Sequence, residues 1–273
     1  MWYFKGDLME VFGSEAQRRM STMGEHLMQL LGDDPRFCSH GRGIQIANEY
    51  SGALDDAVAM ARILGITAIE SIPREEVATA RERIESEGLK TDTIACYLGS
   101  LNCVEAARQV VATHALPEDL TIRVIDRSSP PEWLEAFAEV ALSHGVLPPI
   151  GPVMRGLSRP GFAMVVVDRS GAPVATAGSV LCHPSSSRLH SRAQWGQLST
   201  KPERMGEGIA KVLGAIALIH SHEKLGATGF KTGIAPGNIP SARLCERLGL
   251  EDSGNDIVAI IDPHVYSEDR LTK

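Results

Sequence analysis

The sequence lacks a long hydrophobic run, because its longest apolar stretch, residues 212–219, is far shorter than the roughly 20 residues of a membrane-spanning helix. Its N-terminus has an aromatic start and early acids instead of a basic head and an apolar segment, so no secretion signal is expected. Low-complexity tracts are also missing. A composition of 43% hydrophobic and 22% charged residues excludes a disordered chain, a collagen and a coiled-coil rod. A length of 273 residues predicts two domains.

Cysteine is scarce, and basic charge is in deficit. The five cysteines are scattered and no pair has zinc-ligand spacing, so we expect no metal site and reduced thiols in a cytoplasm. The 34 acidic residues outnumber the 27 basic ones, which disfavours a protein that binds nucleic acid through a basic face. Neither a nucleic acid nor a membrane is therefore expected as a partner.

The first half of the chain, residues 1–117, has the apolar spacing of a mostly helical domain. We expect helices over residues 15–31, 44–64, 73–88 and 101–114, and a strand near 91–97. No internal repeat is visible in the sequence. Pro117 and the two acids that follow it mark the predicted domain boundary.

The second half, residues 118–273, has a different pattern. Alternating apolar residues, turn signals and amphipathic stretches predict the order β-α-β-β-β-α-β-α-β. This order indicates a mixed α/β or α+β domain, preceded by the mostly helical one.

A glycine-rich loop follows a predicted strand of this domain and opens a long helix. Gly206 and Gly208 lack a Cβ atom, so the backbone can turn tightly and approach a ligand closely. The free N–H groups at such a helix start favour an anion, usually a phosphate. Neither the dinucleotide-binding nor the Walker pattern fits, because Lys211 stands three residues after Gly208 and no Gly-Lys-Ser/Thr occurs. By itself the loop fits a ligand-free turn equally well.

A second motif begins 28 residues after Ala210. It reads N-I-P-S-A-R-L-C-E-R-L-G-L over residues 238–250, and the loop reads T-K-P-E-R-M-G-E-G-I-A over residues 200–210. The pair resembles the Gcn5-related N-acetyltransferase (GNAT) superfamily, with its loop V-x-P-E-Y-R-G-x-G-I-G and its helix N-x-x-A-x-x-L-Y-x-x-x-G-F. The resemblance spans residues 119–263 and implies a GNAT-like mixed central sheet flanked by helices, with acetyl-CoA as co-substrate.

The resemblance also implies which residues hold acetyl-CoA. In the family, loop amides bind the pyrophosphate, the end of the preceding strand pairs with the pantetheine arm, and the asparagine of the helix motif contacts that arm. In this sequence the strand residues are Leu198, Ser199 and Thr200, the loop residues are Met205, Gly206, Glu207, Gly208, Ile209, Ala210 and Lys211, and the helix residues are Asn238 and Ser241.

Three residues depart from the family pattern. Met205 stands where Arg or Gln is usual, although Arg204 is adjacent, and Glu207 stands where Lys is common. The charge of Glu207 opposes a phosphate unless its side chain points away. Cys245 replaces the tyrosine that protonates the leaving thiolate in many members. It is either a proton donor, since a free thiol has a pKa near 8.5, or a buried apolar residue of the helix.

The sequence does not identify the general base. An amine that attacks the thioester must lose a proton, often to a carboxylate through water. Residues 194–200, on the strand before the loop, contain no carboxylate. The candidates are His183, His190, Asp256 and Asp262, all of which also fit ordinary structural positions, whereas Glu203 fits a helix-entry charge.

The sequence therefore predicts an N-acetyltransferase that moves an acetyl group from acetyl-CoA to an amine of a small molecule or peptide by direct attack. A non-catalytic acyl-CoA-binding regulatory module and a purely structural α/β domain are the alternatives. The first half is predicted to be either an accessory domain that binds the acceptor or dimerises, or a decayed second acetyltransferase domain. A homodimer is expected only on general frequency.

Overall fold

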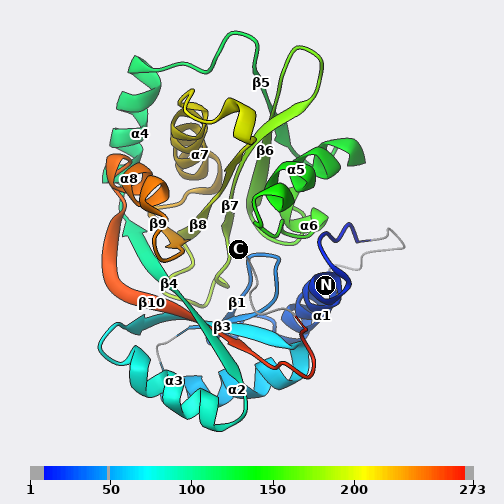
Figure 1. Ribbon diagram of the computed structural model, residues 1–273, viewed down its shortest axis with the longest axis vertical. Coiled ribbons are helices and arrows are strands. Elements are labelled where there is room, and N and C mark those ends of the chain that lie inside the picture. The colour runs from blue at the N-terminus through cyan, green and yellow to red at the C-terminus, as the bar shows by residue number, and fades with distance from the viewer. Residues whose placement is uncertain (1–8, 48–49, 268–273) are drawn as a thin grey trace.

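The computed structural model describes residues 9–47 and 50–267, and it places both halves of the chain around one mixed sheet (Figure 1). The helices are α1 (Glu15–Leu31), α2 (Ala53–Leu64), α3 (Val77–Ser86), α4 (Asn102–Thr113), α5 (Pro131–Ser143), α6 (Gly151–Met154), the 3₁₀ helix η1 (Pro202–Arg204), α7 (Ile209–Leu225) and α8 (Ile239–Arg247). The strands are β1 (Phe37–Cys38), β2 (Gln45–Ile46), β3 (Ile66–Pro73), β4 (Lys90–Gly99), β5 (Thr121–Ile125), β6 (Gly161–Val167), β7 (Pro173–Leu181), β8 (Arg192–Thr200), β9 (Gly229–Ile234) and β10 (Glu251–Ile261).

Helices cover both faces of the sheet, as strand β6 shows. Its alternate side chains enter two different cores, because side chains along a strand point to opposite faces. Phe162 and Met164 pack in the core beneath α4 and α7, whereas Ala163 and Val165 pack in the core beneath α5. In Figure 1, α4, α7 and α8 gather on one side of β6 and β7, and α5 and α6 lie on the other. The predicted fold class, a mixed central sheet flanked by helices, is confirmed.

The two halves of the chain repeat one order of elements. In the first half β1 pairs antiparallel with β2. Helix α2 connects β2 to β3, and these two strands pair in parallel. In the second half β7, β8, α7 and β9 have the same arrangement. Each half then adds a helix and a long strand, α3 with β4 and α8 with β10. A fold can therefore repeat where the sequence shows no repeat.

The last strand of each half lies in the sheet region of the other half. Strand β10 pairs with β3, strand β4 pairs with β9, and β10 and β4 pair with each other. The full order is β1-β2-β3-β10-β4-β9-β8-β7-β6-β5. The boundary predicted at Pro117 thus lies within a chain whose sheet is continuous, and the division into residues 1–117 and 118–273 stays a prediction.

Most predicted elements are present, but the helix expected over residues 44–64 was too long. Gln45 and Ile46 form β2 instead, because their backbone pairs with β3. Helix α2 begins only after Gly52, whose φ of 98° lies in the left-handed region and cannot belong to a right-handed helix. Pro73, predicted in the first turn of a helix, is the last residue of β3, and α3 starts at Val77. Among the described helices, none combines the length and the apolar character needed to span a membrane.

Candidate acyl-CoA site and a buried polar cluster

Strand β8 is paired on both sides at its start and diverges from β9 along its second half. The parallel pairing of the two strands runs from Arg192 to Gln194 on β8 and does not continue to Thr200. A register shift against β7 coincides with Gly196, at φ 137°, and Gln197, at φ 55°. Gln197 is the one non-glycine residue with a positive φ in the described part of the chain. Beyond this bulge, no strand within residues 9–47 and 50–267 lies beside the backbone groups on the β9 side of β8.

The predicted strand residues lie directly after the bulge. Ser199 and Thr200 are buried, and their backbone pairs with β7. The side-chain oxygens of Gln197, Ser199 and Thr200 have no hydrogen-bond partner among the described residues. Buried polar atoms are normally satisfied, so three such oxygens in four consecutive residues indicate a place for a polar ligand. The sequence signal for the bulge is Gly196, which interrupts the apolar alternation of the strand.

The glycine loop has the backbone geometry that its sequence predicts. Gly206 and Gly208 have φ angles of 86° and 79°, and Gly208, the N-cap of α7, has no side chain to accept hydrogen bonds from the helix amides. A Cβ atom added at Gly208 would lie 3.9 Å from Cε of Lys211, with no other atom of a described residue within 4 Å beyond the adjacent backbone. The loop therefore presents helix-start amides, an open approach and a lysine side chain on one surface, an arrangement that suits a phosphate.

Glu207 forms an ion pair within the loop. Arg204 donates to both of its carboxylate oxygens, at 2.7 and 2.8 Å, and also to both oxygens of Asp119, at 2.9 and 3.3 Å. Hydrogen bonds from Arg204 lower the pKa of the Glu207 carboxyl below its usual value. The acid that stands in place of the common lysine thus faces a guanidinium.

The second motif begins helix α8 through Asn238. The Oδ1 atom of Asn238 accepts a hydrogen bond from the Ser241 amide at 3.2 Å, which is an ordinary N-cap interaction. Cys245 lies in the core next to α4, and burial raises the pKa of its thiol to about 12. Such a thiol stays protonated near neutral pH and is a poor proton donor. The structure brings the loop and strand residues together along β8 and α7, and it places Cys245 among apolar side chains.

Three of the four candidate bases are held by neighbouring groups. Asp256 is paired with Arg74 at 3.1 Å, and Asp262 is paired with Arg62 at 2.8 Å. The Nδ1 atom of His190 lies 2.9 Å from the carbonyl oxygen of Ser187 in its own turn. Each of these side chains has a local structural partner that accounts for its position.

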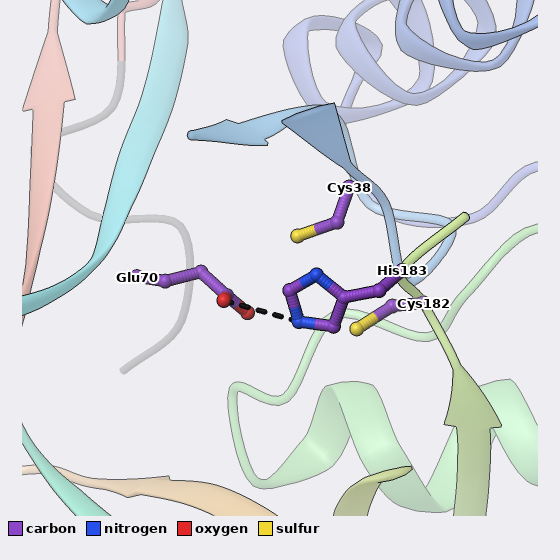
Figure 2. Close-up of side chains that lie close together, drawn as sticks. All are labelled: Cys38, Glu70, Cys182 and His183. Carbon is purple, nitrogen blue, oxygen red and sulfur yellow. Dashed lines mark ion pairs between the residues drawn. The ribbon is translucent and has the colours of Figure 1, made fainter. Parts of the chain in front are cut away.

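The fourth candidate, His183, belongs to a buried polar cluster that sequence spacing could not reveal. It lies with Cys38, Glu70 and Cys182, and one ligand atom of each residue lies within 4.8 Å of those of the others (Figure 2). All four residues are buried. The residues come from β1, β3 and the segment after β7, so only tertiary structure assembles them.

The charges in this cluster are strongly coupled. Burial alone would raise the pKa of Glu70, but Lys231, His183 and Arg192 hold it well below its usual value. A hydrogen bond from Cys38 lowers the pKa of the Cys182 thiol. Burial opposes a charge on His183, yet the adjacent Cys182 and Glu70 raise its pKa to about 9.

Comparison with known proteins supports the fold. No family model matches the sequence, and no curated protein matches it either. Among solved structures, a GCN5-related N-acetyltransferase from Kribbella flavida is similar with a TM-score of 0.54 and 16% identity, over 89% of this chain and 95% of that chain. A tandem GNAT protein from the clavulanic acid biosynthesis pathway has a TM-score of 0.53 and 13% identity, over 80% of this chain and 74% of that one.

A Drosophila protein is similar at a TM-score of 0.52 and 13% identity, over 81% of this chain and 71% of its own length. The matched regions cover most of the chain, whereas the sequence motifs indicated only the second half. At such low identity the likeness concerns the fold. The chain therefore has a GNAT-like fold over most of its length.

Proposed function

We propose that the protein is an acetyltransferase that takes acetyl-CoA as co-substrate and acetylates an amine of a small molecule or a peptide. The observation that carries the proposal is the divergence of β8 from β9 at the Gln197 bulge, followed at once by the glycine loop that starts α7. An unpaired backbone edge is thus followed directly by an anion site at the start of a helix. This arrangement suits a long ligand with a phosphate group.

The loop residues fit the phosphates of coenzyme A. Amides from Met205 to Lys211 would donate to the pyrophosphate, since helix-start N–H groups and the helix dipole favour an anion. The surroundings of Gly206 and Gly208 are open, because a Cβ atom added at Gly206 meets no atom in the described part of the chain within 4 Å outside the adjacent backbone, and one added at Gly208 meets only Cε of Lys211 at 3.9 Å. The Lys211 ammonium adds a positive charge at the same surface.

The strand residues fit the rest of the molecule. Backbone groups of Leu198, Ser199 and Thr200 on the unpaired side of β8 would bond the pantetheine amides, as an added strand does. A backbone N–H of this segment would also stabilise the oxyanion that forms on the thioester carbonyl. Asn238 and Ser241, at the start of α8, are the proposed contacts to the cofactor arm.

The chemistry needs few protein groups. Acetyl-CoA supplies an activated acetyl thioester, and the acceptor amine attacks it directly. Positioning alone can supply a large part of the rate enhancement of such a step. Asp256, Asp262 and His190 have local partners, and His183 is buried. We therefore propose that the attacking amine loses its proton to water. Cys245 stands where a tyrosine protonates the leaving thiolate in many GNAT proteins, but burial raises the pKa of its thiol to about 12, so we expect it to take no part in proton transfer.

For residues 1–117 we propose a degenerate second copy of the same unit. The repeated element order and the left-handed Gly52 at the start of α2, which corresponds to Gly208 at the start of α7, support this origin. The first turn of α2 contains Asp55 and Asp56, whose charges oppose a phosphate. We therefore place the acyl-CoA site in the second half only.

The proposal is tested first by ligand binding. We expect acetyl-CoA, but neither ATP nor NAD, to raise the thermal midpoint, because a ligand at about 100 times its Kd adds about 2.7 kcal/mol of stability. A Gly208→Asp variant should lose this shift, since it brings a side chain and a negative charge to the loop. Gly226→Asp is the matched control: Gly226 caps the other end of α7 at φ 72°, against 79° for Gly208. Equal binding by both variants would contradict the assigned site.

Turnover separates the enzyme from a binding module. With a panel of amines, the wild-type protein should release free coenzyme A thiol in proportion to acetylated amine. The burial of Cys245 and the local partners of the candidate bases are the observations that favour a module without activity. Binding of acetyl-CoA with no thiol release across the panel would support that module and refute the acetyltransferase.

A further inference from the structure

The buried cluster of Cys38, Glu70, Cys182 and His183 has no part in the proposed reaction, yet it contains two thiols, an imidazole and a carboxylate. The side chains of Glu70 and His183 have exposed fractions of 1% and 0%. In Figure 2 the four side chains converge on one region between β3 and the end of β7. A concentration of this kind inside a protein core needs a physical reason, because desolvation of polar groups is costly.

Three separate segments of the backbone hold the cluster. Cys38 is paired with Gln45 in the short β1–β2 hairpin, and the amide of Ser39 donates to the carbonyl of Cys182 at 3.2 Å. This bond places the two cysteines side by side although they are far apart in sequence. Glu70 enters from the middle of β3, which is held between β2 and β10. The side chains thus stand on paired strands and their direct extensions.

The two buried ring nitrogens of His183 indicate that the cluster binds a ligand. Nε2 lies 3.1 Å from Oε2 of Glu70, but neither ring nitrogen has a partner with hydrogen-bond geometry among the described residues. The two atoms form an ion pair when the imidazole is protonated, and their separation is also close to that of two ligands of one metal ion. In a tetrahedral zinc site, neighbouring N and O ligands lie about 3.3 Å apart and two sulfurs about 3.8 Å apart.

Glu70 has the surroundings of an oriented metal ligand. Its Oε1 accepts from Nζ of Lys231 at 2.6 Å, and its Oε2 accepts from Nη2 of Arg192 at 3.2 Å. A carboxylate has about four lone-pair positions, so these bonds leave capacity on Oε2 for a cation. Outer hydrogen bonds of this kind fix ligating carboxylates in known metal sites.

We propose that Cys38, Cys182, His183 and Glu70 form a binding site for one Zn²⁺ ion. The donor set of two sulfurs, one imidazole nitrogen and one carboxylate oxygen matches the ligands and the coordination number of structural zinc. With all four donor atoms already within 4.8 Å of one another, inward shifts of about 1 Å or less complete a tetrahedral shell.

The charge balance permits this ion next to two cations. Glu70 carries one negative charge against the positive charges of Lys231 and Arg192. Binding forms two Zn–S bonds, one Zn–N bond and one Zn–O bond, and it releases two protons from the thiols and the imidazole to solvent. Two positive charges enter and two leave, so the net charge of the buried region does not change on binding.

The site would join the two halves of the chain. Cys38 and Glu70 belong to the first half, while Cys182 and His183 belong to the second. Because all four ligands are buried and would fill a four-coordinate shell, the ion would have a structural role and would not meet the substrate. It would hold the β1–β2 hairpin, which has only two paired residues on each strand, against the end of β7.

The test is the metal content of the full-length protein. The chain is expressed in zinc-supplemented medium, purified under reducing conditions without chelator, and analysed by elemental mass spectrometry. We expect about one zinc per folded chain. Growth in cobalt-supplemented medium should give the intense visible absorption of tetrahedral Co²⁺ and the near-ultraviolet charge transfer of cobalt–thiolate bonds, a readout that requires no variant.

Substitutions then assign the ligands. Cys38→Ser and Cys182→Ser should lower the zinc content at least fivefold and remove the cobalt–thiolate band. Cys103→Ser is the matched control, because Cys103 is also a fully buried free cysteine but lies in the core beneath α4 and α7. It should keep both signals.

Two results would overturn the proposal. One is a folded wild-type protein that contains no stoichiometric zinc and shows no cobalt–thiolate absorption. The other is a peptide map in which Cys38 and Cys182 form a disulfide in the protein as purified, since oxidised sulfurs cannot bind the ion. Neither result depends on acetyl-CoA binding, so the zinc site and the proposed activity are tested independently of each other.

Discussion

Arg204 donates hydrogen bonds to both carboxylate oxygens of Glu207, at 2.7 and 2.8 Å, so the acid inside the glycine loop faces a cation. Asp119 completes the group, and the three side chains together carry one negative charge. The loop therefore tolerates an acid at a position where lysine is common in GNAT loops, but the residual charge still opposes a bound phosphate.

A Glu207→Gln variant should for that reason bind acetyl-CoA more tightly than wild type. Removing one charge at a distance of several ångströms in water changes the affinity by about two- to threefold. Calorimetric titration at low and high salt measures the change, which should shrink at high ionic strength because exposed charges are screened. Glu223→Gln, near the other end of α7, is the control and should have no effect. A weaker affinity of Glu207→Gln would mean that Glu207 itself contacts the ligand.

The bulge at Gln197 gives a second prediction. A β-branched side chain is more strained than glutamine at the φ of 55° that Gln197 adopts, so Gln197→Val should lower stability by about 1 kcal/mol and straighten β8. Gln197→Gly can keep the conformation, and the hydrogen bond from Thr176 Oγ1 to the carbonyl at 2.8 Å does not need the side chain. Thermal unfolding and acetyl-CoA titration of both variants provide the measurement. Undiminished binding by the valine variant would show that the bulge does not form the site.

Cys245 provides a third prediction. Because burial raises its thiol pKa to about 12, Cys245→Ala should leave the rate of acetyl transfer unchanged between pH 6 and 9 and lower stability by about 1 kcal/mol. Initial rates across this pH range, together with the thermal midpoint, separate the two effects. A rate that falls more than tenfold in the variant would establish the thiol as the proton donor.

Asp262 predicts part of the acid sensitivity of the fold. Hydrogen bonds from Arg62 lower the pKa of its carboxyl, and Oδ1 also accepts from the amide of His264 at 3.0 Å. A depressed folded-state pKa stabilises the protein above the unfolded value of about 3.9, and this stability is lost as the pH falls through the folded value. Asp262→Asn should therefore cost about 1–2 kcal/mol at pH 7.

Below the depressed folded-state pKa of Asp262, the Asp262→Asn variant and wild type should unfold at similar denaturant concentrations, since both side chains are then neutral. Urea titrations at the two pH values measure the difference. A constant gap between the two proteins at both pH values would show that the amide disturbs packing and that the ion pair contributes nothing.

Local patterns were enough to predict most elements of the chain. The helix at residues 15–31 has the predicted bounds, since it is amphipathic and Ser14 and Gln17 form a capping box at its start. The glycine loop was visible because a positive φ at Gly206 and Gly208 requires a residue without Cβ. The order of strands and helices along the second half could be predicted, because apolar alternation and turn residues act within a few positions.

The tertiary structure decided everything that depends on distant segments. The exchange of β4 and β10, the departure of β8 from β9 and the meeting of Cys38 with Cys182 all join residues that no local periodicity connects. His183 illustrates the difference: in the sequence it is a histidine in a polar loop, and in the fold it is a buried imidazole beside Glu70. Strand pairing and burial select among many partners of equal local propensity. The sequence by itself therefore determined most of the elements and the glycine loop, whereas packing determined the short strand β2 and the buried cluster.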